Sequence, residues 1–245
     1  MAFNSVKRAD DLVLVRNVLI STYDKSGLAA FVQGIVSIAD DTSAGSAVGS
    51  GIRLYSTGGT YDALKEALAA LAGASGPALV KVSDYTGQPE MKGGLVKTLD
   101  WKIYLGLLAE KGDAAHEADL ARSGAVAFDM VIANLYPFAE AASDEQSAPE
   151  DLRQRIDIGG PCMIRAAAKN YLRVASVSSP DQYSAILAEL KATGGATSFA
   201  TRRRLAVEAF SLTSRFDKLV SHKLLELDRE ELASAYGVER KAGDC

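Results

Sequence analysis

Short β-branched runs that alternate with helical patterns constrain this 245-residue chain more than any other feature of its sequence. Strands that alternate with helices of this length typically form βαβ units, in which successive strands pair in parallel. The pattern therefore predicts an α/β protein built on a parallel sheet. We expect strands at residues 13–20, 52–55, 78–82, 130–133 and 174–177, and helices at residues 28–38, 61–71, 114–122 and before Lys191.

The pattern changes near residue 196. From Ser198 onward it is helical, with Leu205, Ala209 and Phe210 among the apolar residues at recurring spacing. We therefore expect an α/β domain at residues 1–195 and a C-terminal helical extension at residues 196–245, packed on the domain or at a subunit interface. Stretches rich in Gly, Ser and Ala at residues 40–51 and 73–77 are expected to be surface insertions.

Composition excludes several classes of protein. The net charge is −4 and the basic cluster Arg202–Arg204 lies in a helical pattern, where we expect a solvated face rather than a nucleic-acid interface. No apolar run reaches the roughly 18 residues that would indicate a membrane span. Cys162, Cys245, His116 and His222 lack the spacing of a disulfide framework or a metal site. The sequence predicts a cytoplasmic protein without metal, nucleic-acid or membrane partners.

Polar residues follow the first two expected strands. Ser21 and Lys25 follow the first, and Thr57-Gly58-Gly59-Thr60 follows the second. Ligands of parallel sheets bind at the carboxyl ends of the strands, and the N–H groups of a helix that begins there attract anions. Two such loops side by side suggest a phosphate-bearing ligand. The alternative is that Gly58 and Gly59 make a tight turn while the hydroxyls cap helices.

Three later segments carry further candidates. Gly93–Thr98 contains Lys97 beside a turn, and Asn134–Phe138 contains Tyr136 after the fourth expected strand. Asp157–Asn170 contains a Gly-Gly-Pro helix start, whose N–H groups could hold an oxyanion. Each has a simpler interpretation: a surface lysine, a packed tyrosine ring, or an aspartate that caps the helix, which ends in Lys169 and Asn170.

Taken in order, these segments resemble the IMP cyclohydrolase domain of the bifunctional enzyme that also has AICAR formyltransferase activity. The resemblance spans about residues 15–225. It is carried by several long motifs, among them Ser-Thr-Gly-Gly-Thr, Asn-Leu-Tyr-Pro-Phe and Ile-Asp-Ile-Gly-Gly-Pro. The matching segments lie at residues 21–27, 56–60, 82–91, 93–99, 134–138, 156–170 and 201–210.

The resemblance implies a methylglyoxal synthase-like fold, with a five-stranded parallel sheet and helices on both sides. It also implies a cofactor-free reaction on a purine ribotide, the ring closure of 5-formamidoimidazole-4-carboxamide ribotide (FAICAR) to IMP and water. Family members are usually dimers, so a homodimer is expected. The chain ends where a transformylase domain would begin, so we expect a free-standing cyclohydrolase that receives FAICAR from a separate enzyme.

By resemblance, each candidate receives a role. Lys97 and Thr98 lie over the carboxamide and formyl arms, and Asn170 anchors the base. Asp157, Tyr136 and Lys169 handle protons, while the amide of Gly159 donates to the oxyanion. The phosphate and ribose are held by Ser21, Lys25, Thr57, Gly58, Gly59 and Thr60.

Several positions depart from the family. Leu95 stands where arginine is usual, Asp100 and Tyr104 stand where histidines are usual, and Tyr23 stands where serine is common. Arg8, Arg53 or Lys102 are the candidates to replace the missing arginine. Two alternative functions stay open: a non-catalytic ribotide-binding regulatory module, and a methylglyoxal synthase-type lyase.

Overall fold

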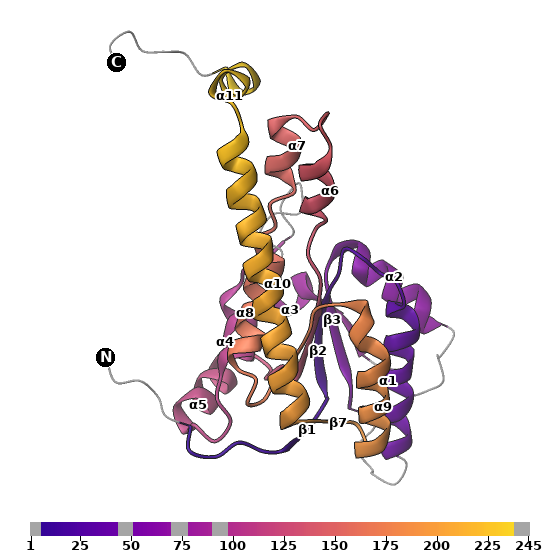
Figure 1. Cartoon of the computed structure of the whole chain (residues 1–245). Helices are drawn as coiled ribbons and strands as arrows, with labels where there is room; N and C mark the ends of the chain where they lie inside the picture. The colour runs from indigo at the N-terminus through magenta and orange to yellow at the C-terminus, as the bar shows by residue number, and fades with distance from the viewer. Residues whose placement is uncertain (1–5, 44–50, 70–77, 90–97, 238–245) are drawn as a thin grey trace.

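The central sheet has five parallel strands. A computed structural model describes residues 6–43, 51–69, 78–89 and 98–237, and the sheet order is β4-β3-β2-β5-β6 (Figure 1). This confirms the α/β fold expected from the sequence. The strands are β2 (Asn17–Ser21), β3 (Arg53–Ser56), β4 (Ala78–Lys81), β5 (Met130–Ala133) and β6 (Ala175–Val177).

The first expected strand is two strands. β1 (Leu12–Leu14) leaves the sheet and pairs antiparallel with β7 (Ala196–Ser198), whereas β2 begins three residues later and occupies the centre of the sheet. Asp129 accepts hydrogen bonds from the N–H groups of Arg16 and Asn17, each at 2.9 Å, which fixes the bend between the two strands. A continuous apolar run in the sequence gives no sign of this bend.

Alternate side chains of the strands face two separate cores. Val18 and Ile20 of β2 pack on one face and Leu19 packs on the other, as the period of two in a strand requires. The first core is closed by α1 (Leu28–Ser43), α2 (Gly58–Ala69) and, after the 3₁₀ turn η2 (Pro180–Gln182), α9 (Tyr183–Thr193).

The second core lies under a different set of helices. Ile103, Phe128 and Ile164 are fully buried there against the other face of the sheet. Because α10 crosses this face, the first helix of the expected C-terminal extension packs directly on α8 and β6, and the extension's first residues, Ala196–Ser198, form the strand β7. The helices are α3 (Val82–Thr86), α4 (Trp101–Leu108), α8 (Gly159–Lys169) and α10 (Phe199–Glu226). The next helix after α4, α5 (Ala114–Ser123), has no buried residue.

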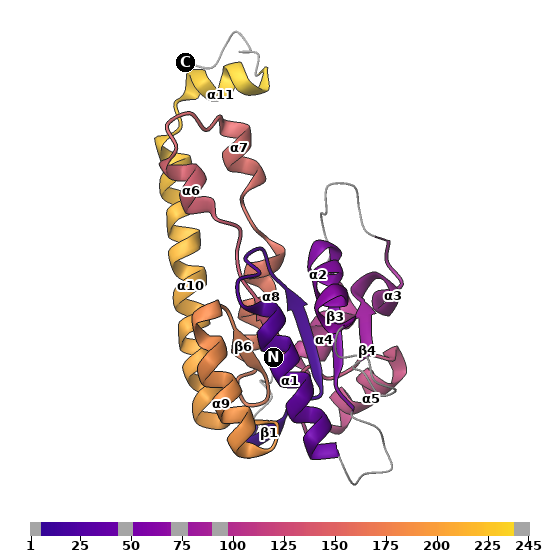
Figure 2. The same ribbon diagram turned by 90° about the vertical axis from the view of Figure 1, so that its right-hand side faces the viewer.

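An arm extends beyond the sheet. The C-terminal part of α10 runs past the sheet beside α6 (Phe138–Ser143) and α7 (Pro149–Gln154), with α11 (Arg229–Tyr236) at its tip (Figure 2). A small apolar cluster holds the arm together, with Phe138, Leu152 and Phe216 at its centre. Residues 44–50 and 73–77 of the two expected insertions lie outside the described residues, and α1 continues to Ser43. None of the described helices combines the length and apolar character needed to cross a membrane.

Arg202 corrects one expectation about the basic cluster. Arg203 and Arg204 are exposed, but the Arg202 side chain is fully buried. Its guanidinium donates to five backbone carbonyls from three parts of the chain, so all five of its N–H groups are used. The acceptors are the carbonyl oxygens of Asp10, Asp11, Tyr171, Leu172 and Thr197.

The substitution Arg202→Ala is expected to destabilise the fold by about 3–5 kcal/mol, because it leaves buried carbonyls without donors. Urea unfolding followed by circular dichroism measures the loss. Arg203→Ala is the matched control and should change stability by no more than about 0.5 kcal/mol. Equal effects of the two substitutions would contradict the role given to Arg202.

Candidate functional site

A cavity of about 330 Å³ opens at the carboxyl ends of the central strands. Its walls come from the loops after β2, β3 and β5, from the segment before α4, and from the start of α8. Lys25 and Asp157 are the charged side chains among its described lining residues. The lining comprises Ser21, Thr22, Tyr23, Lys25, Thr57, Gly59, Thr60, Thr98, Leu99, Asn134, Tyr136, Gln154, residues 156–160 and Met163.

The loops after β2 and β3 are bonded to each other. The Thr60 hydroxyl donates to the Thr22 carbonyl at 3.0 Å and accepts from the Thr22 N–H at 3.2 Å. Ser21 Oγ lies 3.4 Å from Thr57 Oγ1. Gly58, with φ of 45°, adopts the left-handed conformation that lets the chain turn from β3 into α2. The reciprocal bonds hold both loops at one edge of the cavity.

Two helices begin at the cavity wall. Gly59 and Thr60 belong to the first turn of α2, and Gly159 and Gly160 belong to the first turn of α8. The first four N–H groups of a helix have no partner within it, and the helix dipole makes this end positive. With the exposed ammonium of Lys25 on the same wall, the α2 end of the cavity suits a phosphate group.

Asp157 lies at the other end of the cavity, at the start of α8. Its Oδ1 accepts the N–H of Gly160 at 2.9 Å. A Cβ at position 160 would lie 2.5 Å from Asp157 Oδ2, so only glycine leaves room for this carboxylate. Burial raises the pKa of Asp157 above its ordinary value, although backbone hydrogen bonds from Gly160 and Tyr136 oppose the shift. A raised pKa makes the ionised carboxylate a better proton acceptor.

Thr98 and two tyrosines complete this end. The Thr98 side chain is buried, and its Oγ1 lies 3.1 Å from where a Cβ at Gly159 would be. Gly159 therefore permits close packing of the hydroxyl against the start of α8. The exposed rings of Tyr23 and Tyr136 meet edge to face at 5.3 Å between centroids, at the rim of the cavity.

Nine of the thirteen predicted site residues line this one cavity. They come from five segments that are far apart in the sequence: Ser21, Lys25, Thr57, Gly59, Thr60, Thr98, Tyr136, Asp157 and Gly159. Gly58 forms the turn between the lining residues Thr57 and Gly59 but does not itself line the cavity. Lys97 lies outside the described residues.

Lys169 and Asn170 are not brought to this cavity. They end α8, whose first residues line the cavity, and eleven helical residues span about 16 Å. Asn170 is buried and donates to the carbonyls of Leu107 and Ala109, so it fixes the end of α4. Neither Lys169 nor Asn170 is among the described residues that line this cavity, so the roles expected for them at the reacting groups and at the base stay predictions.

The candidates to replace the family arginine are also elsewhere. Lys102 donates to the Tyr85 carbonyl at 2.8 Å and lies over its ring, while Arg53 begins β3 at the opposite end of the sheet. Arg8 lines a different cavity. Asp100, which stands in place of a family histidine, caps α4 by accepting the Lys102 N–H at 2.7 Å. The departure at Asp100 thus has a structural role.

One group of side chains has the spacing of metal ligands. Glu110, Asp113 and His116 each place a ligand atom within 4.8 Å of the others, away from the site described above. His116 Nδ1 accepts the Glu110 N–H, and Asp113 caps α5 through the Ala115 N–H. Because the Nδ1 of His116 and the carboxylate of Asp113 already have structural partners, the group carries no metal assignment.

Asn134 is a site residue that the sequence argument did not single out. Its Oδ1 accepts the N–H groups of Tyr23 and Asp24 at 2.7 and 3.0 Å, and its Nδ2 donates to the Asp24 carbonyl at 2.7 Å. Three hydrogen bonds thus fix the loop after β2 to the loop after β5. Its place in the same motif as Tyr136 was the sequence feature that could have identified it as a site residue. Its hydrogen-bond partners in the loop after β2 are visible only in the folded structure.

Comparison with known proteins agrees with this geometry. Residues 42–162 match the family described as an MGS-like domain, and residues 167–242 match the AICARFT/IMPCHase bienzyme family. The crystal structure of ForH superposes with a TM-score of 0.67 at 27% identity, covering 86% of this chain and 99% of that chain. Fold and site together define an MGS-like α/β protein with a phosphate-suited cavity.

Sequence relatives identify the family within this class of MGS-like proteins. The bifunctional purine biosynthesis protein PurH of Synechococcus sp. is 43% identical over 83% of this chain, and that of Chlorobium phaeovibrioides is 38% identical over 91%. The chain belongs to the AICARFT/IMPCHase family. It spans about a third of the length of these relatives, 35% and 38% respectively.

The substitution Asn134→Ala is expected to weaken binding of inorganic phosphate about tenfold, because it releases the loop that carries Ser21 and Lys25 (a tenfold loss corresponds to about 1.4 kcal/mol). Isothermal titration calorimetry measures the affinity. Asn17→Ala is the matched control, since Asn17 bonds Ala127 at the opposite end of the sheet. Unchanged phosphate affinity in a folded Asn134→Ala protein would show that the hydrogen bonds of Asn134 do not position the loop.

Proposed function

We propose that this chain is an IMP cyclohydrolase, which closes FAICAR to IMP with loss of water. The single observation that carries the proposal is the meeting of Lys25, Thr57 and Thr60 with Thr98 and Asp157 in one cavity. The homology to PurH proteins supports it independently. The reaction is a redox-neutral dehydration, so the proposal includes no cofactor.

The phosphate and ribose are assigned to the end of the cavity between the loops after β2 and β3. Lys25 supplies a positive charge, Ser21 and Thr57 supply hydroxyls, and Gly59 in the first turn of α2 supplies an N–H group. Thr60, also assigned to this end by the resemblance, contributes by fixing the loop, since its hydroxyl already bonds Thr22. Asn134 and Thr60 keep these loops together before the ligand arrives. Binding at this end then presents the base to the start of α8.

Ring closure is assigned to the other end of the cavity. The carboxamide nitrogen forms a bond to the formyl carbon, and Asp157 accepts the proton that this nitrogen loses. That proton passes to the formyl oxygen, which gives a tetrahedral intermediate with a hydroxyl group. The carbon–hydroxyl bond then breaks, the former formamido nitrogen loses its N–H proton as the C=N bond forms, and this second proton leaves with the hydroxyl as water. Holding both arms in attack geometry lowers the entropic part of the barrier. A well-placed donor to the developing oxyanion, such as the Gly159 amide, is typically worth about 100- to 1,000-fold.

Two further assignments rest on the resemblance. We assign the Lys97 ammonium group the role of stabilising the transition state, so Lys97→Ala is expected to lower turnover more than substrate affinity. Tyr136 is assigned to proton handling beside Asp157, since both line the cavity. Lys169 is not included, because α8 carries it away from the reacting groups.

A ribotide-binding module without turnover is the second candidate. One observation favours it: neither Arg8, Arg53 nor Lys102 lines the cavity in place of the family arginine. A binding protein would keep the phosphate loops but need no carboxylate with a raised pKa. The position of Asp157 therefore favours the enzyme.

The deciding experiment adds FAICAR to the purified protein and follows the absorbance of IMP. Wild type is expected to turn over, and Asp157→Asn is expected to lose at least about 100-fold in kcat. Because Asp157 must be ionised to accept a proton and its pKa is raised, wild-type kcat should increase as pH rises through that raised value. The residual kcat of Asp157→Asn should not show this increase with pH.

Calorimetry with IMP separates the two candidates. IMP binding without turnover of FAICAR selects the binding module, and the absence of both rejects the ribotide assignment. Asp144→Asn is the matched control, since Asp144 caps the connection after α6 and does not line the cavity. Full turnover by Asp157→Asn would refute the role given to this carboxylate.

We also propose that the protein forms a homodimer through the arm. A groove of about 480 Å³ there is lined mainly by apolar residues, including Ile158, Leu224 and Leu225, which are 58%, 48% and 83% exposed. The groove shares Ile156, Asp157 and Ile158 with the candidate site, so a second copy seated on it would also close that side of the site. Exposed apolar patches of this kind mark interfaces.

Multi-angle light scattering after size-exclusion chromatography is expected to give twice the chain mass of 25.8 kDa. Leu225→Glu should shift the protein to monomer, because it places a charge in the apolar groove. Val207→Glu is the control, an exposed apolar residue on the same helix outside the groove. A monomeric wild type, or a dimer unaffected by Leu225→Glu, would refute this interface.

A further inference from the structure

Two tyrosine rings stand at the mouth of the candidate site. Tyr23 and Tyr136 are 53% and 49% exposed, and both line the cavity at the carboxyl ends of the strands. Their rings meet edge to face, with 5.3 Å between centroids and 62° between planes. Among the described residues, no third ring and no cation packs against this pair. About half of the surface of each tyrosine is therefore open to a ligand.

The backbone beneath both rings is anchored. Asn134 Oδ1 accepts the N–H of Tyr23 at 2.7 Å, and Asn134 belongs to the same loop as Tyr136. The N–H of Tyr136 in turn bonds the Asp157 carboxylate. Because these residues are already ordered in the protein without ligand, less conformational entropy is lost when a ligand packs on the rings.

The pair lies between the two ends of the cavity. Tyr23 comes between Ser21 and Lys25 in the loop assigned to the phosphate, whereas the backbone of Tyr136 bonds the carboxylate assigned to proton transfer. In a ribotide the heterocycle lies between the phosphate and the reacting arms. A ligand that reaches both ends of the cavity therefore places its heterocycle beside the two tyrosines.

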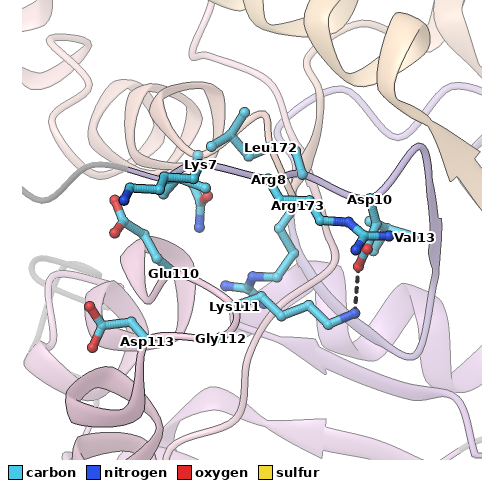
Figure 3. A pocket seen from close by; sticks show the side chains of 13 residues that line it. Lys7, Arg8, Asp10, Val13, Glu110, Lys111, Gly112, Asp113, Leu172 and Arg173 are labelled. Atoms are coloured by element: carbon cyan, nitrogen blue, oxygen red, sulfur yellow. Dashed lines mark hydrogen bonds and ion pairs between the residues drawn. The ribbon is translucent and has the colours of Figure 1, made fainter.

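Aromatic rings recognise heterocycles through their faces. Stacking tolerates any base, because every base has a π-face, and a tyrosine supplies this surface with only two side-chain torsions to order. The cavity of about 530 Å³ that Arg8 lines is different, since its described lining residues include charged side chains but no aromatic ring (Figure 3). Of these two cavities, only the candidate site offers a surface on which a planar ring can stack.

We propose that Tyr23 and Tyr136 form the stacking surface for the heterocycle of the ribotide, and that Tyr23 thereby sets the preference for a ligand with a base. The inference rests on the proposed function, because it assigns the part of the same cavity between the phosphate and the reacting arms. Stacking fixes the plane of the heterocycle. It therefore keeps the carboxamide and formyl arms directed at Asp157, which favours attack geometry.

Calorimetry with IMP and with ribose 5-phosphate tests the assignment, because ribose 5-phosphate has the phosphate and the ribose but no base. Wild type is expected to bind IMP at least about tenfold more tightly than ribose 5-phosphate. Tyr23→Leu should weaken IMP binding about tenfold and leave ribose 5-phosphate unchanged, because it removes the aromatic face but keeps an apolar side chain. Tyr23→Phe keeps the ring and should retain the wild-type affinity for both.

Proton NMR of the bound nucleotide gives a second readout, which a purely structural role of Tyr23 would not change. The ring current of a stacked tyrosine moves the H2 and H8 signals of bound IMP upfield. We expect this shift in wild type and in Tyr23→Phe, and a smaller one in Tyr23→Leu. Tyr236→Leu is the matched control and should change neither measurement, since Tyr236 is 44% exposed on α11 and does not line the cavity.

The outcomes separate this inference from the proposed function. If wild type binds neither IMP nor ribose 5-phosphate, the ribotide assignment is rejected and the stacking surface with it. If wild type binds IMP and Tyr23→Leu binds it equally well, the stacking role alone is overturned. An equal loss of both ligands in Tyr23→Leu also overturns it, since Tyr23 then only shapes the phosphate loop. A loss of IMP binding in Tyr23→Phe as large as that in Tyr23→Leu assigns the effect to the hydroxyl and contradicts stacking.

Discussion

The guanidinium of Arg202 joins parts of the chain that the sheet does not hold. Its five N–H groups are used on backbone carbonyls of the N-terminal segment, the turn before β6 and β7. No other side chain presents five donors in one plane. Since α10 carries this arginine near its start and Phe216 further along, one helix anchors both the base of the molecule and the arm. The cavity that Arg8 lines is formed in part by the same segments, through Asp10 and Leu172.

The candidate site depends on a different kind of bond, short hydrogen bonds between loops. Asn134 and Thr60 tie the loop after β2 to its neighbours on either side, so the three loops keep one geometry without a ligand. The cavity is then polar but sparsely charged, with Lys25 at one end and Asp157 at the other. Unlike charges at the two ends are what the proposed ligand requires, since its phosphate needs a cation and its reacting arms need a proton acceptor.

Much of this could be predicted from the sequence, because strands and the polar residues directly after them are local patterns. The strand at 130–133 and the loop residues Ser21, Thr57 and Thr60 follow from such patterns. Predictions failed where the answer depends on how a helix is placed. A helical pattern does not tell that Asn170 bonds the end of α4, and it does not tell that Arg202 faces the interior. The role of the Asn134 amide could not be predicted either, because it bonds residues of a loop that is far from it in the sequence.

The contact between Asp157 and Gly160 means that the residue types allowed at these two positions depend on each other. The oxygen of the carboxylate occupies the space that a methyl group at 160 would need. A side chain at position 160 is compatible with an acid at position 157 only if the carboxylate and the Leu135 side chain move from their present places. Residues 157 and 160 should therefore vary as a pair among homologous chains, and a homologue with alanine at the second position will have given up the acid, or moved it, as well.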